Sequence, residues 1–278
     1  MTMAGDAAGF AATGLARVPA AFTARDVAAI RSAVWATLAG YGIRADAPTT
    51  WIAGGALPLI EIAGALRPGD VGPMWAVGRD PACAALRPAL ARAVDAVFGP
   101  GVWSPADEHG GQAMPNLPIA GAPWAVPHAA WHVDEPTVAG QGAAWGLLGF
   151  ACLDDVAPGG GATVAVAGSH RALARLAAAR GPGAVVTTDD GLAALAAADP
   201  WFAELRLPGD AAARRARYLD ADHDHAGLPL RVVELTGRAG DLLLMDPRLL
   251  HTVAANAGGR PRLVVRLLCS RAIAGFPP

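Results

Sequence analysis

The chain of 278 residues contains no lysine, and only 6% of its residues are aromatic. All 22 basic residues are arginines, which excludes mechanisms that need a lysine, such as Schiff-base catalysis or phosphate binding by a P-loop. The 24 acidic residues bring the formal net charge to -2. No excess of positive charge is available for nucleic acid or for an anionic membrane surface, so neither partner is expected.

Cysteines and long apolar runs are scarce as well. Cys83, Cys152 and Cys269 lie far apart, so they form neither a CxxC motif nor a disulfide framework. The hydrophobic fraction of 53% reflects 67 alanines, and polar residues, Gly or Pro interrupt every apolar stretch before the roughly 20 residues that span a bilayer. The first residues also lack the features of a secretion signal. We expect a cytoplasmic protein, monomeric or homodimeric, that binds no membrane.

The first third of the chain favours helices. Apolar residues recur at helical spacing between Thr23 and Ala39, and a second helix is expected from about residue 81 to 98, before Gly99. Downstream, short apolar runs bounded by turn residues predict strands at 143–153, 162–167, 230–235, 241–245 and 263–269. The sequence therefore predicts an antiparallel β-sandwich or barrel that is covered on one face by helices.

We expect this architecture to form a single domain over residues 1–278. Residues 1–105 are expected to be mostly helical support, and residues 106–278 to hold the β-core. A stretch rich in Ala, Leu and Arg predicts a helical insertion into that core over about residues 171–229.

The most informative segment is Trp131-His132-Val133-Asp134-Glu135-Pro136. On an extended strand, residues two apart point to the same face, so the imidazole of His132 and the carboxylate of Asp134 would converge. Taken alone, this spacing also fits a buried histidine or a surface ion pair. A second segment strengthens the metal interpretation, because a predicted strand ends shortly before His251, and Arg262 opens another strand eleven residues later.

Two histidines and one carboxylate that leave part of an octahedron open are typical of non-haem Fe(II) oxygenases. The planar guanidinium of Arg262 suits a carboxylate of an organic co-substrate. Together with Gly159-Gly160-Gly161-Ala162-Thr163 and Gly168-Ser169-His170-Arg171, these motifs resemble the phytanoyl-CoA dioxygenase family of Fe(II)- and 2-oxoglutarate-dependent oxygenases. The resemblance extends from about Gln112 to Arg271.

The resemblance implies a mainly β fold with flanking helices: a double-stranded β-helix (jelly-roll, cupin-like) core with an N-terminal helical layer and a helical insertion. It implies Fe(II), 2-oxoglutarate and O₂ as cofactor and co-substrates. His132, Asp134 and His251 would be the catalytic iron ligands, Arg262 the partner of the 2-oxoglutarate C5 carboxylate, and Thr163 a hydroxyl donor to the same molecule. His170 would be a turn residue.

Two positions depart from the family pattern. Val253 stands where many relatives have a serine that assists the arginine, with Thr252 beside it, and Ala129 stands where relatives often have Gln or an aromatic residue. Other contacts to 2-oxoglutarate must therefore come from elsewhere, and Gln112 and Asn116 are the candidates.

The implied activity is hydroxylation of a small molecule with release of succinate and CO₂. The carboxylate of Asp134 argues against halogenation, since related halogenases have a small residue there. Desaturation, cyclisation or epimerisation at the same iron site, and a non-catalytic ligand-binding barrel, are the alternatives. The few charges near the motifs favour a neutral or weakly polar substrate.

Other histidines compete as ligands. The segment 220–225, Asp-Ala-Asp-His-Asp-His, contains HxH and DxD spacings, but its flanks predict a solvated polar loop rather than a metal site. His109 and His128 are single histidines in predicted loops, and we expect each to be a surface or packing residue rather than a ligand. Most tryptophans, Trp75 included, are expected to pack in the core.

Overall fold

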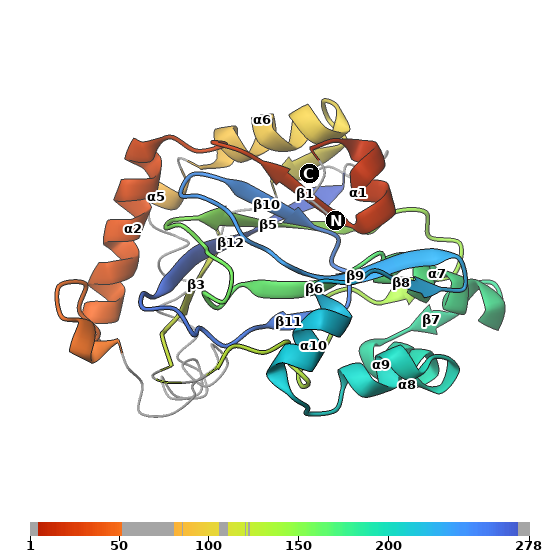
Figure 1. Ribbon diagram of the computed structural model, residues 1–278. Coiled ribbons are helices and arrows are strands. Elements are labelled where there is room, and N and C mark those ends of the chain that lie inside the picture. Colours follow the sequence, from red (N-terminus) through yellow and green to blue (C-terminus); the bar gives the residue numbers. More distant parts are fainter. Residues whose placement is uncertain are drawn as a thin grey trace.

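The computed structural model describes residues 5–51, 81–84, 86–105, 111–119, 121 and 123–271 (Figure 1). His109 and Trp75 lie outside these residues. The elements in chain order are α1 (Ala7–Thr13), β1 (Leu15–Val18), α2 (Ala24–Ala39), a 3₁₀ turn (Pro48–Thr50), α5 (Pro81–Ala84), α6 (Arg87–Phe98), β2 (Trp103–Pro105), β3 (Gln112–Asn116), β4 (Thr137–Val138), β5 (Gly146–Cys152), β6 (Thr163–Ala167), α7 (Ser169–Arg180), β7 (Val185–Val186), α8 (Thr188–Ala198), α9 (Pro200–Leu205), α10 (Ala211–Tyr218), β8 (His223–His225), β9 (Leu228–Glu234), β10 (Leu242–Met245), β11 (His251–Val253) and β12 (Arg262–Arg271).

Two antiparallel sheets form the centre of the molecule. The larger sheet has the strand order β1-β10-β5-β12-β2, with β3 also paired to β12, and the smaller sheet has the order β11-β6-β9-β8. Apolar side chains of both sheets share one interior cluster, to which β5 contributes Leu148 and Phe150, β6 contributes Ala165, and β12 contributes Val264. The sheets therefore face each other across a common core.

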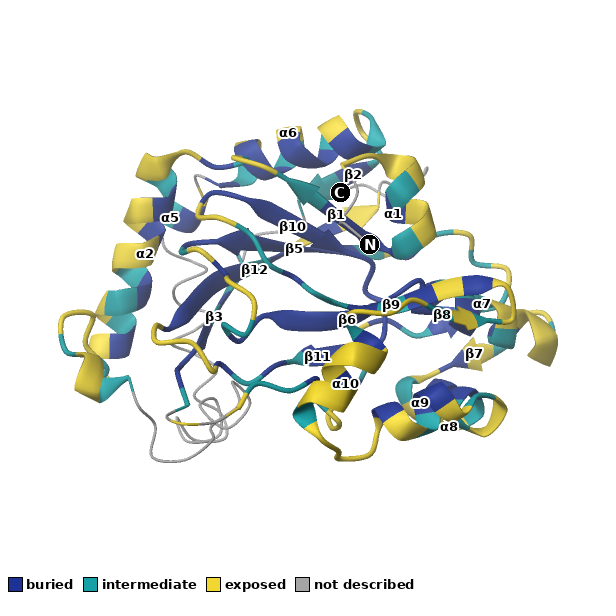
Figure 2. Ribbon diagram, in the orientation of Figure 1, coloured by how far each residue is buried: buried dark blue, intermediate teal, exposed yellow. Residues whose placement is uncertain are grey.

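Helices cover the outer faces of both sheets, as Figure 1 shows. Strand alternation explains how, because Leu147 and Ala151 of β5 and Val265 of β12 point away from the interior and pack against α2, α5 and α6. On the smaller sheet, the outward side chains of β6 and β9 pack against α7, α8 and α9. The central strands are accordingly buried, and the solvent-facing sides of the helices are exposed (Figure 2).

The helix predicted from Thr23 is confirmed as α2. The Thr23 hydroxyl accepts a hydrogen bond from the backbone N–H of Asp26, and the Asp26 carboxylate accepts one from Thr23, which completes a capping box. The second predicted helix is divided into α5 and α6. Pro88 explains the new start, because proline is favoured in the first turn of a helix but lacks the N–H that a continuous helix requires.

Several strands lie outside the five predicted runs, and β1 and β8 are two of them. Leu15–Val18 forms β1, an edge strand whose pairing with β10 supplies hydrogen bonds that so short a segment lacks by itself. Residues 223–225, predicted to lie in a solvated loop, form β8 and pair with β9 instead. The insertion contains α7, α8, α9 and α10, so its helical character is as predicted.

In the glycine-rich motif, position 161 has no room for a side chain. Gly161 has φ +78°, and a Cβ there would lie 2.5 Å from the Asn116 side-chain nitrogen. The missing side chain lets Asn116 donate hydrogen bonds of 2.9 Å to the carbonyls of both Gly161 and Ala254. The motif thereby fastens β3 to the loops at one end of the sandwich. Within the ranges given above, no helix is long and apolar enough to cross a membrane.

Candidate metal centre

His132 and His251 are joined directly through their backbones. Each N–H donates to the other residue's carbonyl at 2.9 Å, which forms an isolated antiparallel bridge, and the two ring centroids lie 4.2 Å apart. His251 opens β11, and the bridge extends that strand with the segment around His132. Two residues that are distant in the sequence are therefore held side by side before any ion binds.

The hydrogen bonds of the two rings leave matching nitrogens available. Nδ1 of His132 lies 2.8 Å from the carbonyl of Ala130, and Nδ1 of His251 lies 2.8 Å from that of Leu249. Because a carbonyl only accepts, each neutral ring carries its proton on Nδ1 and keeps a lone pair on Nε2. The two Nε2 atoms lie 3.6 and 3.8 Å from the carboxylate oxygens of Asp134. The three groups could hold a metal ion between them.

The three side chains of the centre differ in their exposure to solvent. The exposed fraction of the side chain falls from 42% at His132 to 27% at Asp134 and 6% at His251. Burial, together with the neighbouring His132, lowers the pKa of His251 to about 4. The ring is therefore neutral at neutral pH, which is the form that binds a metal.

Backbone contacts fix the segment that carries Asp134. The carbonyl of Pro247 accepts hydrogen bonds from the N–H groups of Asp134 at 2.8 Å and Glu135 at 3.2 Å. Thr188, the first residue of α8, accepts another at 3.0 Å from Val133. Glu135 is buried, and its carboxylate accepts from the backbone N–H groups of Trp145 and Gly146. Of the two adjacent carboxylates, only Asp134 faces the histidines.

The Gly-Ser-His motif also supports the centre. Ser169 is fully buried, and its hydroxyl accepts a hydrogen bond of 2.9 Å from the N–H of Leu250, the residue before His251. This role was missed from the sequence, although the motif itself was visible. His170 is buried at the start of α7 and lies 3.2 Å from the carbonyl of Ala11, away from the histidine pair.

The inward face of β12 runs from a closed end to an open end. Alternate residues lie on this face, namely Arg262, Val264, Arg266 and Leu268. Their exposure rises from 3% at Arg262 and Val264 to 48% at Leu268. Arg266 lies 3.3 Å from the Asp134 carboxylate, so the metal centre is near the open end. Gln112 and Asn116 on β3 stand opposite Arg266 and Arg262, respectively.

Arg262 is buried without a counter-charge. Among the described residues, its Nε and Nη2 atoms have no hydrogen-bond partner, and neither has the side-chain oxygen of Asn116 opposite it. Burial lowers the pKa of the Arg262 guanidinium to about 10. Because an unpaired buried cation is unfavourable, these donors fit an anionic group of a ligand. A carboxylate suits the planar guanidinium best.

The other predicted residues, Thr163 and Val253, lie on β6 and β11. Thr163 is 4% exposed and opens β6 opposite Val253 of β11, two residues from the pair formed by Ala165 and His251. Thr163 and Val253 therefore share the face of His251. Val253 offers no hydrogen bond there, and the Thr252 hydroxyl donates to the carbonyl of Ala129 instead.

The family model of phytanoyl-CoA dioxygenase (PhyH) matches residues 10–264. The chain belongs to the phytanoyl-CoA dioxygenase family. It is thus an Fe(II)- and 2-oxoglutarate-dependent oxygenase, an oxidoreductase that uses O₂, as the resemblance implied. The two facing sheets are the jelly-roll core expected for the family, so the predicted fold class is confirmed.

The chain is similar to several solved structures at low sequence identity. EvdMO1 has a TM-score of 0.52 and 17% identity, over 95% of this chain and 48% of that protein. AviO1 from Streptomyces viridochromogenes Tue57 has a TM-score of 0.48 and 17% identity, over 100% and 99% of the two chains. HygX from Streptomyces hygroscopicus, crystallised with nickel and 2-oxoglutarate, has a TM-score of 0.44 and 16% identity, over 95% and 85%. No curated protein sequence matches the chain.

One expectation about polar residues outside the PhyH motifs needs correction. His223 and His225 do not lie in a solvated loop, because β8 turns both imidazoles toward Asp199. Arg214, which precedes this segment in the sequence, is 7% exposed and donates to the carbonyls of Val126 and Pro127, among others. This buried arginine anchors α10 to the segment that precedes His132. His128 is exposed.

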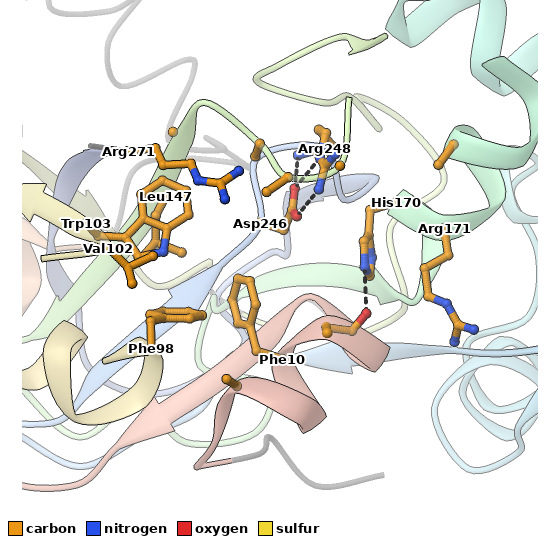
Figure 3. Close-up of a pocket in the computed structure, with 17 residues that line it drawn as sticks. Phe10, Phe98, Val102, Trp103, Leu147, His170, Arg171, Asp246, Arg248 and Arg271 are labelled. Atoms are coloured by element: carbon orange, nitrogen blue, oxygen red, sulfur yellow. Dashed lines mark hydrogen bonds and ion pairs between the residues drawn. The ribbon is translucent and has the colours of Figure 1, made fainter. Parts of the chain in front are cut away.

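A pocket of about 330 Å³ lies on the other side of the segment that supports Asp134 (Figure 3). Its apolar part is lined by Phe10, Phe98 and Trp103. On its polar side, Asp246 binds Arg248 through two hydrogen bonds of 3.0 and 2.7 Å. Both side chains are 6% exposed, and Pro247 between them supplies the carbonyl that holds Asp134. The buried ion pair thus flanks the proline whose carbonyl holds the backbone of Asp134.

Replacing Asp246 by Asn should lower the free energy of unfolding by about 3–5 kcal/mol, because it leaves the guanidinium of Arg248 buried without its partner. Urea denaturation followed by circular dichroism measures this change. Asp46→Asn is the matched control: Asp46 pairs with Arg44 at the surface, where water screens the charges, and its loss should leave stability unchanged. Equal effects of the two substitutions would contradict a stabilising role for the buried pair of Asp246 and Arg248.

Proposed function

We propose that this oxygenase binds Fe(II) through His132, Asp134 and His251 and hydroxylates a small molecule, with release of succinate and CO₂. The observation that carries the proposal is that two features lie on the same inward surface. Two imidazoles and a carboxylate converge near the open end, and a guanidinium that has no partner among the described residues lies farther in along β12. The first is a donor set for iron, and the second is a receptor for a carboxylate.

Hydrogen bonds within the protein already orient the proposed ligands of the metal. The hydrogen bonds to Ala130 and Leu249 orient the imidazoles and raise their basicity, so little rearrangement is needed to present both Nε2 atoms. Arg266 contacts one Asp134 oxygen, Oδ2, at 3.3 Å. This contact restrains the carboxylate and leaves Oδ1 without that neighbour. When bound, Fe(II), 2-oxoglutarate and O₂ supply the oxidising chemistry.

We assign the C5 carboxylate of 2-oxoglutarate to Arg262. Arg262 lies four positions before Arg266, which corresponds to about 13 Å along a strand, so Arg262 is deeper in the core than the metal ligands. Thr163 would donate its hydroxyl to the same co-substrate, because it is buried on the face of His251. Gln112 would reach it from β3, opposite Arg266. Val253 leaves these groups without help from its own strand.

The substrate would enter from the open end of β12. Leu268 is 48% exposed although it lies on the inward face, which supports an apolar wall at the entrance. Arg266 and Gln112, which are partly exposed, lie between this apolar wall and the metal ligands. An enclosure of this kind holds a C–H bond near the metal and limits access of water. Such a lining favours a neutral or weakly polar small molecule.

His132→Ala and His251→Ala should each abolish the weak visible absorption band that forms when Fe(II) and 2-oxoglutarate are added without oxygen, because each variant removes one metal ligand. Anaerobic absorption spectroscopy measures the band. His128→Ala, which replaces an exposed histidine, should keep it. A band that persists in both folded ligand variants would overturn the ligand assignment, as would its absence from the folded wild type.

Arg262→Gln should raise the dissociation constant of 2-oxoglutarate by about 10- to 100-fold, since a hydrogen bond to a charged group contributes about 1.5–3 kcal/mol. Titration of the Fe(II)-loaded protein under anaerobic conditions measures the constant. Arg266→Gln makes the same chemical change four residues farther along the same face and should have the smaller effect. The opposite ranking would transfer the carboxylate to Arg266.

Hydroxylation predicts a product that has gained one oxygen atom, formed together with one succinate per turnover. A panel of neutral small molecules incubated with Fe(II), 2-oxoglutarate and air, followed by mass spectrometry and succinate determination, tests this outcome. A product that has lost two hydrogens would identify desaturation or ring closure, and a product of unchanged mass would identify epimerisation. Either result, coupled to succinate, would replace hydroxylation and retain the iron site.

A further inference from the structure

A second cluster of metal-ligand side chains lies outside the centre described above. Oδ2 of Asp199 is 2.7 Å from Nε2 of His223 and 2.8 Å from Nδ1 of His225. One potential ligand atom from each of the three residues falls within 4.8 Å of the other two. The donor set, two imidazoles and one carboxylate, is the same as that of His132, Asp134 and His251.

Local structure explains why these residues converge. His223 and His225 are two apart on β8, so both imidazoles lie on one face of the strand. Asp199 joins α8 to α9, and its Oδ1 caps α9 by accepting a hydrogen bond of 2.9 Å from the N–H of Trp201. The cap fixes one carboxylate oxygen and leaves the other, Oδ2, directed at the two rings.

Aromatic neighbours hold both imidazoles in place. The ring of His223 stacks on Trp201 with 4.8 Å between centroids and 3° between planes. The ring of His225 meets Phe202 edge-on at 5.4 Å and 89°. The side chains of His223, His225 and Asp199 are 24%, 17% and 14% exposed. The cluster is therefore rigid and mostly shielded, but an ion can reach it from solvent.

We propose that Asp199, His223 and His225 form a second metal site, which takes a divalent transition ion such as Zn²⁺. Ligand atoms about 2.1 Å from a tetrahedral zinc ion are about 3.4 Å apart, so a small outward movement of both imidazole nitrogens from Oδ2 would admit the ion. Imidazole ligands select zinc and its neighbours, whereas Ca²⁺ and Mg²⁺ prefer sites built from oxygen.

The ion would cross-link the junction of α8 and α9 to the hairpin of β8 and β9. Because α8 also begins at Thr188, which holds the backbone of Val133, the link fastens the far end of a helix whose first residue touches the catalytic segment. This site is structural, and it binds its ion whether or not the catalytic centre is filled.

The number of bound ions tests the proposal. Tag-free protein is stripped with a chelator, incubated with Zn²⁺, desalted and analysed by inductively coupled plasma mass spectrometry. The wild type should retain two ions per chain, because zinc also occupies the catalytic ligands. The double variant His223→Gln and His225→Gln should retain one, since glutamine keeps an N–H donor for Asp199 but removes the imidazoles. His128→Gln should retain two.

The double variant His132→Gln and His251→Gln separates the two sites. It should retain one ion, and Zn²⁺ should raise its melting temperature, because only the cluster at Asp199 remains. A wild type that retains a single ion, lost in this variant, would overturn the second site and leave the catalytic centre intact. A wild-type count that is unchanged in the folded His223→Gln and His225→Gln variant would overturn it as well. The wild-type count needs no variant to fold.

Discussion

The reciprocal backbone hydrogen bonds between His132 and His251 are the constraint on which the proposed metal centre depends. They join the segment before β4 to the start of β11, so the spacing of the two imidazoles is set by main-chain geometry rather than by flexible side chains. The surrounding contacts act on the same bridge. Pro247 holds the backbone of Asp134, and Ser169 holds the residue before His251. Prepositioned ligands of this kind lower the entropic cost of binding an ion.

Strand alternation then divides the chemistry of β12 between two faces. Leu263, Val265 and Leu267 bury apolar surface under the N-terminal helices, and the intervening positions carry Arg262 and Arg266 inward. Among the described residues, nothing pairs with Nε and Nη2 of the buried Arg262, and burial of an unpaired charge is unfavourable. The fold tolerates this cost because the apolar face of the same strand anchors it in the larger core. A co-substrate carboxylate would relieve the cost, which links binding to stability.

Much of the centre could be predicted from residue spacing. His132 and Asp134 are two apart, and local geometry alone brings their side chains to one face of an extended segment. Glu135 shows the limit of such reasoning, because it is equally acidic and adjacent, yet its carboxylate binds the N–H groups of Trp145 and Gly146. The roles of Ser169 and Thr188 could not be predicted either, since each depends on a contact with a distant segment.

The sequence by itself determined which chemical groups are available and the local periodicity that aligns them: the capped helix α2, the strands, and the alternation that puts Arg262 and Arg266 on one face. Only the tertiary structure decided which groups meet. The sequence predicted a polar loop at His223 and His225, whereas the hairpin of β8 and β9 directs both toward Asp199 at the end of α8. The reason is physical: periodicity acts over a few residues, whereas meetings between distant side chains depend on strand register and on the packing of whole elements.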